Sequence, residues 1–134
     1  MPLTQPRDTK QRSGVDFSFP VAAAKKIFAG AIVATDASGN ATPGATATTL
    51  KAAGRAEQTV DNLLGAAGDV SVSVKKGVFK YKNSSADPIA RADIKGTCYI
   101  VDDETVAKTN GGNTRSAAGT IEDIDTDGVW VRFT

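Results

Sequence analysis

Short strand-like runs, separated at close intervals by clusters of turn residues, make up most of this chain. The clearest run is residues 70–75, where apolar and polar side chains alternate without exception. Such alternation predicts an extended strand with one buried face and one face in water. No stretch sustains the period of an amphipathic helix. The chain is therefore predicted to be all-β, as a small β-barrel or sandwich with an extended N-terminal arm.

Other runs rich in β-branched and aromatic residues also predict strands. Residues 50–57 are ambiguous, because their alanines suit a helix whereas Gly54 and the short length suit a strand, and a strand is favoured. At Lys76 and Gly77 the alternation changes phase, which indicates a bulge or bend. The remaining expected strands are residues 15–20, 26–34, 78–82, 97–101, 105–108, 117–124 and 129–134.

Small and polar residues predict the connections between these strands. Residues 41–49 form a low-complexity segment with a Pro-Gly turn and are expected to be a loop. Asp87 and Pro88 suit the N-cap and the first position of one short helical turn within residues 89–95, and Gly96 would close it. The other predicted connections are residues 35–40, 61–69, 83–88, 102–104, 109–116 and 125–128.

The first segment of the chain, residues 1–14, has neither helical nor strand periodicity. It contains two prolines, and Met1 and Leu3 are its only apolar residues of any size. Two interpretations are open: a disordered terminus, which is common, or an arm that becomes ordered on a neighbouring subunit. The predicted organisation is an extended arm over residues 1–14 and a single β-rich domain over residues 15–134.

The hydrophobic core is expected to be small. Val, Ile, Leu and Phe together supply 28 of the 134 residues, while alanine alone supplies 21. A modest core makes oligomerisation a natural source of additional stability.

The charge of the chain is balanced, with 16 Lys and Arg against 15 Asp and Glu and a net charge of +1. A generic nucleic-acid binder would normally carry a strongly basic surface, so no direct contact with nucleic acid is expected. No run of about 20 apolar residues is present, and no membrane-spanning segment is expected either.

The residue types most used in catalysis are almost missing. The chain has no histidine and one cysteine. This removes the commonest general base, the Ser-His-Asp and Cys-His nucleophile systems, and the common histidine and cysteine zinc sites. The prediction is a protein that is not an enzyme, with no catalytic residues, no cofactor and no metal site. A small hydrolase that depends on paired carboxylates stays open as a less favoured alternative.

Two acidic clusters could in principle bind a cation. Asp123, Asp125 and Asp127 occupy alternate positions, as carboxylates do in calcium loops. However, the twelfth position from Asp123 is Thr134 rather than a glutamate, and the following Asp-Gly pair is a strong hairpin signal. A solvated hairpin turn is therefore favoured. The second cluster, residues 102–104, is expected to be an acidic turn.

Three further features have a structural and a functional interpretation. The lysines at residues 75, 76, 80 and 82 form a basic strand edge or face, which is more often solvated than bound to a partner. Cys98 is expected to pack as a small hydrophobe, because no histidine is available to activate it. Trp130 and Phe133 could stack on a sugar or a base, but core positions are favoured.

A series of segments along the chain forms one collinear pattern: residues 19–23, 29–34, 54–57, 70–79, 87–89, 98–103, 105–107, 115–119 and 127–131. Each segment is weakly specific alone, but their order covers nearly the whole chain. Taken together, they resemble the small capsid cement, or head decoration, proteins of tailed phages and prophages.

This resemblance implies a β-rich structural virion protein on the outer surface of a phage capsid, made in the host cytoplasm. The partners that it implies are the major capsid protein, whose lattice it would stabilise, and further copies of itself, as a homotrimer near local threefold positions. Under this interpretation the arm orders on a neighbouring subunit, with residues 1–20 engaging the shell. The residues expected to bind a partner are Arg7, Lys10, Arg12, Phe17 and Phe19.

An alternative function is a carbohydrate- or host-surface-binding β module. Such a module predicts an exposed aromatic platform, for which Trp130 and Tyr81 are the candidates, and affinity for a glycan as an isolated protein.

Overall fold

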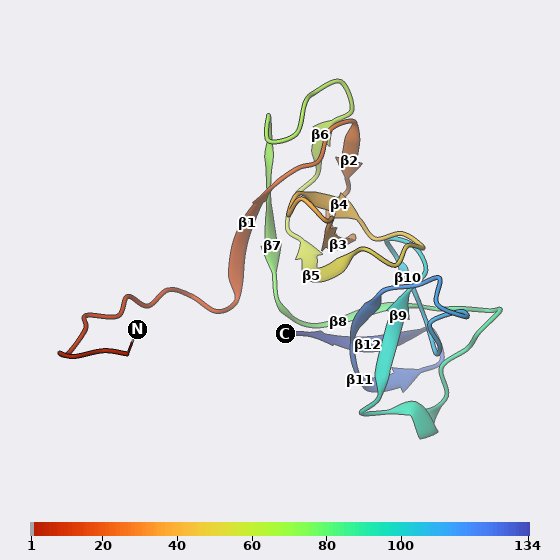
Figure 1. The fold of residues 1–134 in the computed structure, drawn as a ribbon. Helices are drawn as coiled ribbons and strands as arrows, with labels where there is room; N and C mark the ends of the chain where they lie inside the picture. The colour runs from red at the N-terminus through yellow and green to blue at the C-terminus, as the bar shows by residue number, and fades with distance from the viewer. Residues whose placement is uncertain (1) are drawn as a thin grey trace.

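The computed structural model describes residues 2–134, and within them the chain is almost entirely β-structure, with one short 3-10 helix (Figure 1). The prediction of an all-β fold with a small barrel is confirmed. Twelve strands are arranged as a five-stranded sheet, a closed five-stranded barrel and a two-stranded ribbon.

The five-stranded sheet is antiparallel throughout and has the strand order β1-β7-β5-β3-β4. The edge strand β1 pairs with β7 over five residues, from Asp16 opposite Lys75 to Pro20 opposite Ser71. Proline at the end of an edge strand is well placed, because no ladder hydrogen bond is lost there. The strands are β1 (Asp16–Pro20), β7 (Ser71–Lys75), β5 (Lys51–Ala56), β3 (Ile32–Thr35) and β4 (Ala41–Pro43).

The closed barrel follows the order β10-β8-β12-β11-β9. All of its neighbouring strands are antiparallel except β10 and β8, which pair in parallel through Thr105 opposite Lys82 and Val106 opposite Asn83. Closure leaves the barrel with no fully unpaired edge. Its strands are β8 (Gly77–Asn83), β9 (Thr97–Ile100), β10 (Thr105–Ala107), β11 (Ala117–Asp125) and β12 (Gly128–Phe133).

Two hydrophobic cores meet at β3. Ile32 and Ala34 pack into the barrel core, whereas Val33, on the opposite face, packs into the core beneath the five-stranded sheet. All three side chains are fully buried. This explains the continuous apolar run at these positions, because a strand covered on both faces does not need polar residues at alternate positions.

The predicted single strand over residues 26–34 is wrong. It is divided into β2 (Lys25–Ile27) and β3 by a turn over residues 28–31, in which Gly30 has a φ of +89° that favours glycine. β2 instead forms the two-stranded ribbon with β6 (Val60–Asn62), which overlaps the predicted connection over residues 61–69. Strand propensity could not show whether residues 26–34 form one strand or two, because β2 forms by pairing with β6, which is distant in the sequence.

Two other expectations need correction. The expected loop over residues 41–49 begins with β4, whose Ala41 is fully buried, because small side chains fit the close packing of this edge. The predicted helical turn exists as η1 (Arg91–Asp93), but it starts after Ala90, not after Asp87. The Asp93 carboxylate accepts the hydrogen bond from the Ala90 N–H, so the aspartate inside the turn supplies the contact.

The arm has no regular structure between residues 2 and 14, where every residue is exposed. Figure 1 shows it extending from β1 away from both the sheet and the barrel. Met1, the first residue of the predicted arm, lies outside the described residues.

Candidate partner-binding surfaces

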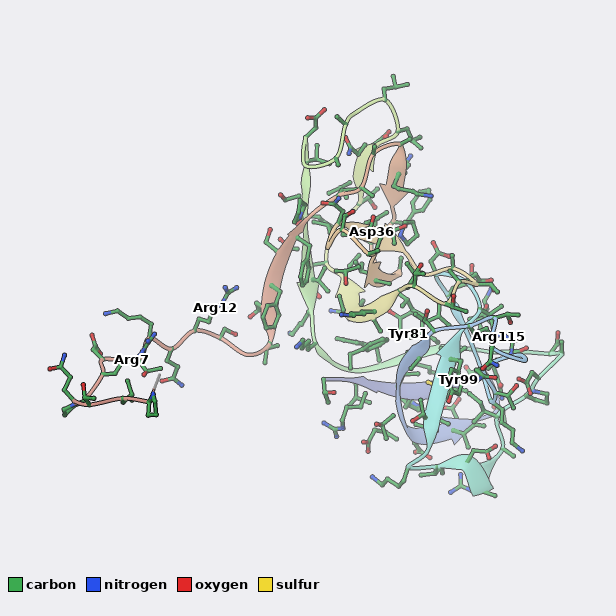
Figure 2. All side chains as sticks on the ribbon, viewed as in Figure 1. Arg7, Arg12, Asp36, Tyr81, Tyr99 and Arg115 are labelled. Atoms are coloured by element: carbon green, nitrogen blue, oxygen red, sulfur yellow. The ribbon has the colours of Figure 1, made fainter. Side chains whose placement is uncertain are left out.

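The predicted partner-binding residues Arg7, Lys10 and Arg12 all lie on the exposed arm. Lys10 forms an ion pair with Asp8 at 2.9 Å, and both side chains are close to fully exposed. An ion pair in this setting contributes little to stability, so it holds Lys10 only weakly. Figure 2 shows Arg7 on the part of the arm far from the body and Arg12 closer to β1, and both side chains are exposed.

The root of the arm is an aromatic cluster on β1. Phe17 and Phe19 point to the same face of the strand, are half-buried, and stack with their ring centroids 6.3 Å apart. The Arg12 guanidinium lies 5.4 Å from the centre of the Phe17 ring, and the Lys76 ammonium lies 4.6 Å from it. The structure thus brings Arg12, Phe17 and Phe19 together, while Arg7 and Lys10 stay separate from this cluster.

A surface that the sequence did not predict is a cleft of about 570 Å³ beside β8. We call it the β8 cleft. One wall is the turn over residues 28–31, the other is formed by Asp103 and Glu104, and residues 80–82 of β8 lie between them. The Tyr81 hydroxyl donates a hydrogen bond of 2.9 Å to the Gly30 carbonyl and fixes the first wall to the barrel. Phe28, at the rim, is 55% exposed.

The charged side chains of the β8 cleft differ in whether they form ion pairs. Lys80 binds the carboxylate of Asp125 at 3.2 Å and also that of Asp127, and Lys82 binds Glu104. Asp103 has no ion-pair partner among residues 2–134. Partial burial, followed by the neighbouring Asp102 and Glu104 charges, raises the pKa of the Asp103 carboxyl. The site therefore favours a cation beside Asp103.

A second unpredicted surface is the turn over residues 62–65, which we call the leucine turn. Leu64 is completely exposed and Leu63 is half exposed. The turn is nevertheless firmly held, because the buried Asn62 side chain donates hydrogen bonds to the carbonyls of Val21, Ala22 and Ala66. Two leucines on a rigid turn form a preorganised apolar projection.

The hairpin turn that the sequence predicted at residues 125–128 is present between β11 and β12. Asp125 and Asp127 lie at the β11–β12 turn, where both bind Lys80. Within the part of the chain that the structure describes, no group of three or more Asp, Glu, His or Cys side chains is arranged to hold a metal ion. The basic lysine face is also divided, because Lys76 lies over Phe17 whereas Lys80 and Lys82 bind carboxylates.

Cys98 packs in the barrel core as predicted. Burial raises the pKa of its thiol to about 11.

The aromatic residues of the barrel differ in exposure. Phe133 is buried as expected, but Trp130 is only half-buried, because strand alternation in β12 turns it away from the core between Val129 and Val131. The Trp130 indole N–H donates to the Asp125 carboxylate at 3.1 Å. Tyr81 is 7% exposed and its hydroxyl is engaged by Gly30, so it does not offer an exposed aromatic platform.

The two unpredicted surfaces differ in how visible they were in the sequence. Adjacent leucines inside a turn segment are a usable signal, since large apolar residues in a connection are seldom needed there. The β8 cleft left no local signal, because its walls come from residues near 30, 80 and 103 that only the tertiary fold brings together.

Comparison of the chain with protein-family models, with curated proteins and with solved structures finds no match. In the described range, none of the helical structure has the length and apolar character needed to cross a bilayer.

Proposed function

We propose that this protein is a structural virion component that binds the outer surface of a phage capsid and stabilises the lattice of the major capsid protein. The proposal starts from the resemblance of a series of segments of this chain, taken in sequence order, to capsid decoration proteins. The observation that carries it furthest is the arm, because thirteen described residues, 2–14, are exposed and project from the body.

An arm of this kind suits attachment to a neighbouring subunit. It makes almost no contact with its own body, so its contact area is available to a partner, and the cost of ordering it falls on assembly. Its three cations, Arg7, Lys10 and Arg12, outnumber its single acid, Asp8. The arm can therefore follow an acidic or polar surface.

The root of the arm supplies a second element of the proposed contact. Phe17 and Phe19 lie on the edge strand β1, which pairs only with β7 in its sheet. An edge strand with half-buried aromatic side chains can accept an added strand or pack against an apolar patch. Repeated on every copy across a lattice, contacts of modest strength add up through avidity.

The test is co-sedimentation with phage heads that were assembled without this protein. We expect the full chain to bind heads saturably, at a fixed ratio to the major capsid protein. Removal of residues 2–14 should abolish binding, and the triple charge reversal Arg7→Glu, Lys10→Glu and Arg12→Glu should weaken it strongly. The matched control is Thr4→Ala, Thr9→Ala and Gln11→Ala, which changes three arm side chains without changing the charge.

The double substitution Phe17→Ser and Phe19→Ser tests the root and should weaken binding to heads, with circular dichroism to show that the chain still folds. A truncated chain that binds heads as well as the full chain would disprove the role of the arm. A full chain that never binds heads would disprove the function, and a glycan screen would then examine the carbohydrate-binding alternative.

A further inference from the structure

The backbone of β8 is open along part of the β8 cleft. The Lys82 N–H donates to the Glu104 carbonyl at 2.8 Å, and the Ser84 N–H donates to the Val106 carbonyl at 2.9 Å, both on the side away from β12. Backbone groups of a strand alternate in direction, so the N–H and C=O of Lys80 face the same side as those of Lys82. β10 begins only at Thr105, opposite Lys82, and leaves Lys80 facing the cleft.

The side chains around this open edge specify the chemistry of an occupant. Asp103 is a half-buried carboxylate with no ion-pair partner among residues 2–134, and Phe28 is exposed at the rim. Asp103 attracts a cation by charge, whereas the Phe28 ring already has one, since the Lys26 ammonium lies 5.0 Å from its centre. An extended peptide that carries lysine or arginine would satisfy the strand edge and Asp103 at once.

We propose that the β8 cleft binds residues 7–12 of the arm of a second copy of this chain, as an added strand beside Lys80 that places Lys10 and Arg12 next to Asp103. The inference goes beyond the proposed function, because this contact joins two copies in the absence of a capsid. Residues 7–12 of one arm can occupy either the cleft or the capsid surface, but not both at once.

The arm matches the cleft in charge, spacing and backbone. Lys10 and Arg12 are two residues apart, so they project to the same side of an extended segment. Residues 7–12 contain no proline, which keeps every N–H available for pairing, whereas Pro2 and Pro6 lie outside them. The arm carries three cations and one acid, opposite in sign to the unpaired Asp103.

A second copy is the favoured source of the arm. In Figure 2, Arg7 and Arg12 lie far from Tyr81, which marks the cleft, and the arm extends away from its own body. Its contacts with the body near the root are those that hold β1, not the cleft. Each copy then offers one arm and one cleft, a heterologous contact that produces either a closed ring or an open chain.

Sedimentation velocity of the full chain over a range of concentrations tests the contact without any capsid. We expect reversible self-association that weakens as salt is raised, because the contact depends on exposed charges. The arm variant Lys10→Glu with Arg12→Glu and the cleft variant Asp103→Lys should each associate at least about tenfold more weakly, a change of about 1.4 kcal/mol. Asp16→Lys is the matched control, since it makes the same charge reversal outside the cleft.

Mixing the two variants decides between a second copy and the chain's own cleft. The arm of each variant then complements the cleft of the other, so the equimolar mixture should regain association that neither variant shows alone. A wild-type chain that stays monomeric at every concentration would overturn the proposal, as would a mixture that fails to associate. Thermal melting of each variant shows that it is folded. Binding to heads is measured separately, so failure here leaves the proposed function standing.

Discussion

Among single residues, Asn62 has the clearest role in shaping a surface. Its amide nitrogen lies 3.3 Å, 3.0 Å and 2.9 Å from the carbonyl oxygens of Val21, Ala22 and Ala66. Buried carbonyls without a partner are costly, so one side chain ties the entry of β2, the end of β1 and the leucine turn together. The exposure of Leu63 and Leu64 thus depends on a polar residue that is itself buried.

The substitution Asn62→Ala is expected to lower the free energy of unfolding by about 1–3 kcal/mol, because it removes the donor to the buried Ala22 carbonyl. The carbonyls of Val21 and Ala66 keep hydrogen bonds from the N–H groups of Gly68 and Asp69. Urea denaturation followed by circular dichroism measures the change. Ser85→Ala, at an exposed position, is the control and should stay within about 0.5 kcal/mol of wild type. An Asn62→Ala protein as stable as the control would contradict this role.

Among the structural elements, the loop over residues 109–114 is held by a single carboxylate. Asp87 accepts hydrogen bonds from the Thr109 hydroxyl, from the Thr109 N–H at 3.0 Å and from Arg115 at 2.9 Å. These contacts, with the Thr109 hydroxyl contributing most, hold the pKa of the Asp87 carboxyl below its ordinary value. The connection before η1 and the connection after β10 are therefore fastened to each other.

Because the pKa of Asp87 is lower in the folded than in the unfolded protein, its contribution to stability is complete above the ordinary value near 4 and is lost as the pH falls through the lowered value. Asp87→Asn should therefore be less stable than wild type at neutral pH, and the difference should shrink as the pH is taken from about 5 toward 2. Unfolding curves at each pH measure it. A difference that stays constant over this range would show that the charge is not responsible.

The individual strands also show which parts of the fold can be predicted from sequence patterns. Strict alternation predicted β7, and β-branched or aromatic runs flanked by turns predicted β1, β8, β9 and β12 closely. The short strands β2, β4 and β6 were not predicted as they occur, because three residues are too few to show a period. The equally short β10 was predicted, since it lies between two clear turn segments. The parallel pairing of β8 with β10 and the β8 cleft could not be predicted, since both arise from contacts between distant segments.

In the whole molecule, β3 joins the two cores. Loss of its pairing would expose Ile32 and Ala34 on one side and Val33 on the other, so neither core can open without disturbing the second. If residues 15–134 form one domain, as the sequence predicts, the two cores should therefore unfold together.

We expect one unfolding transition, with equal calorimetric and van't Hoff enthalpies. Fluorescence of the single tryptophan, Trp130, reports on the barrel, and far-ultraviolet circular dichroism reports on all strands, so the two transitions should coincide. Fluorescence that changes at a lower temperature than circular dichroism would show that barrel and sheet unfold as separate units.

The pairing of β1 with β7 also determines how the protein carries mechanical load. The arm enters β1 at Asp16, and the chain leaves β7 for the barrel at Lys75, directly opposite. Tension between arm and barrel therefore acts at one end of the ladder and peels its five residue pairs apart in turn. Tension between the arm and the start of β7 at Ser71 acts instead at opposite ends of the ladder and loads all five pairs together. The same attachment is thus weak in one direction of pull and strong in the other. Phe17, whose ring lies near the cations of Arg12 and Lys76, reinforces the weak end.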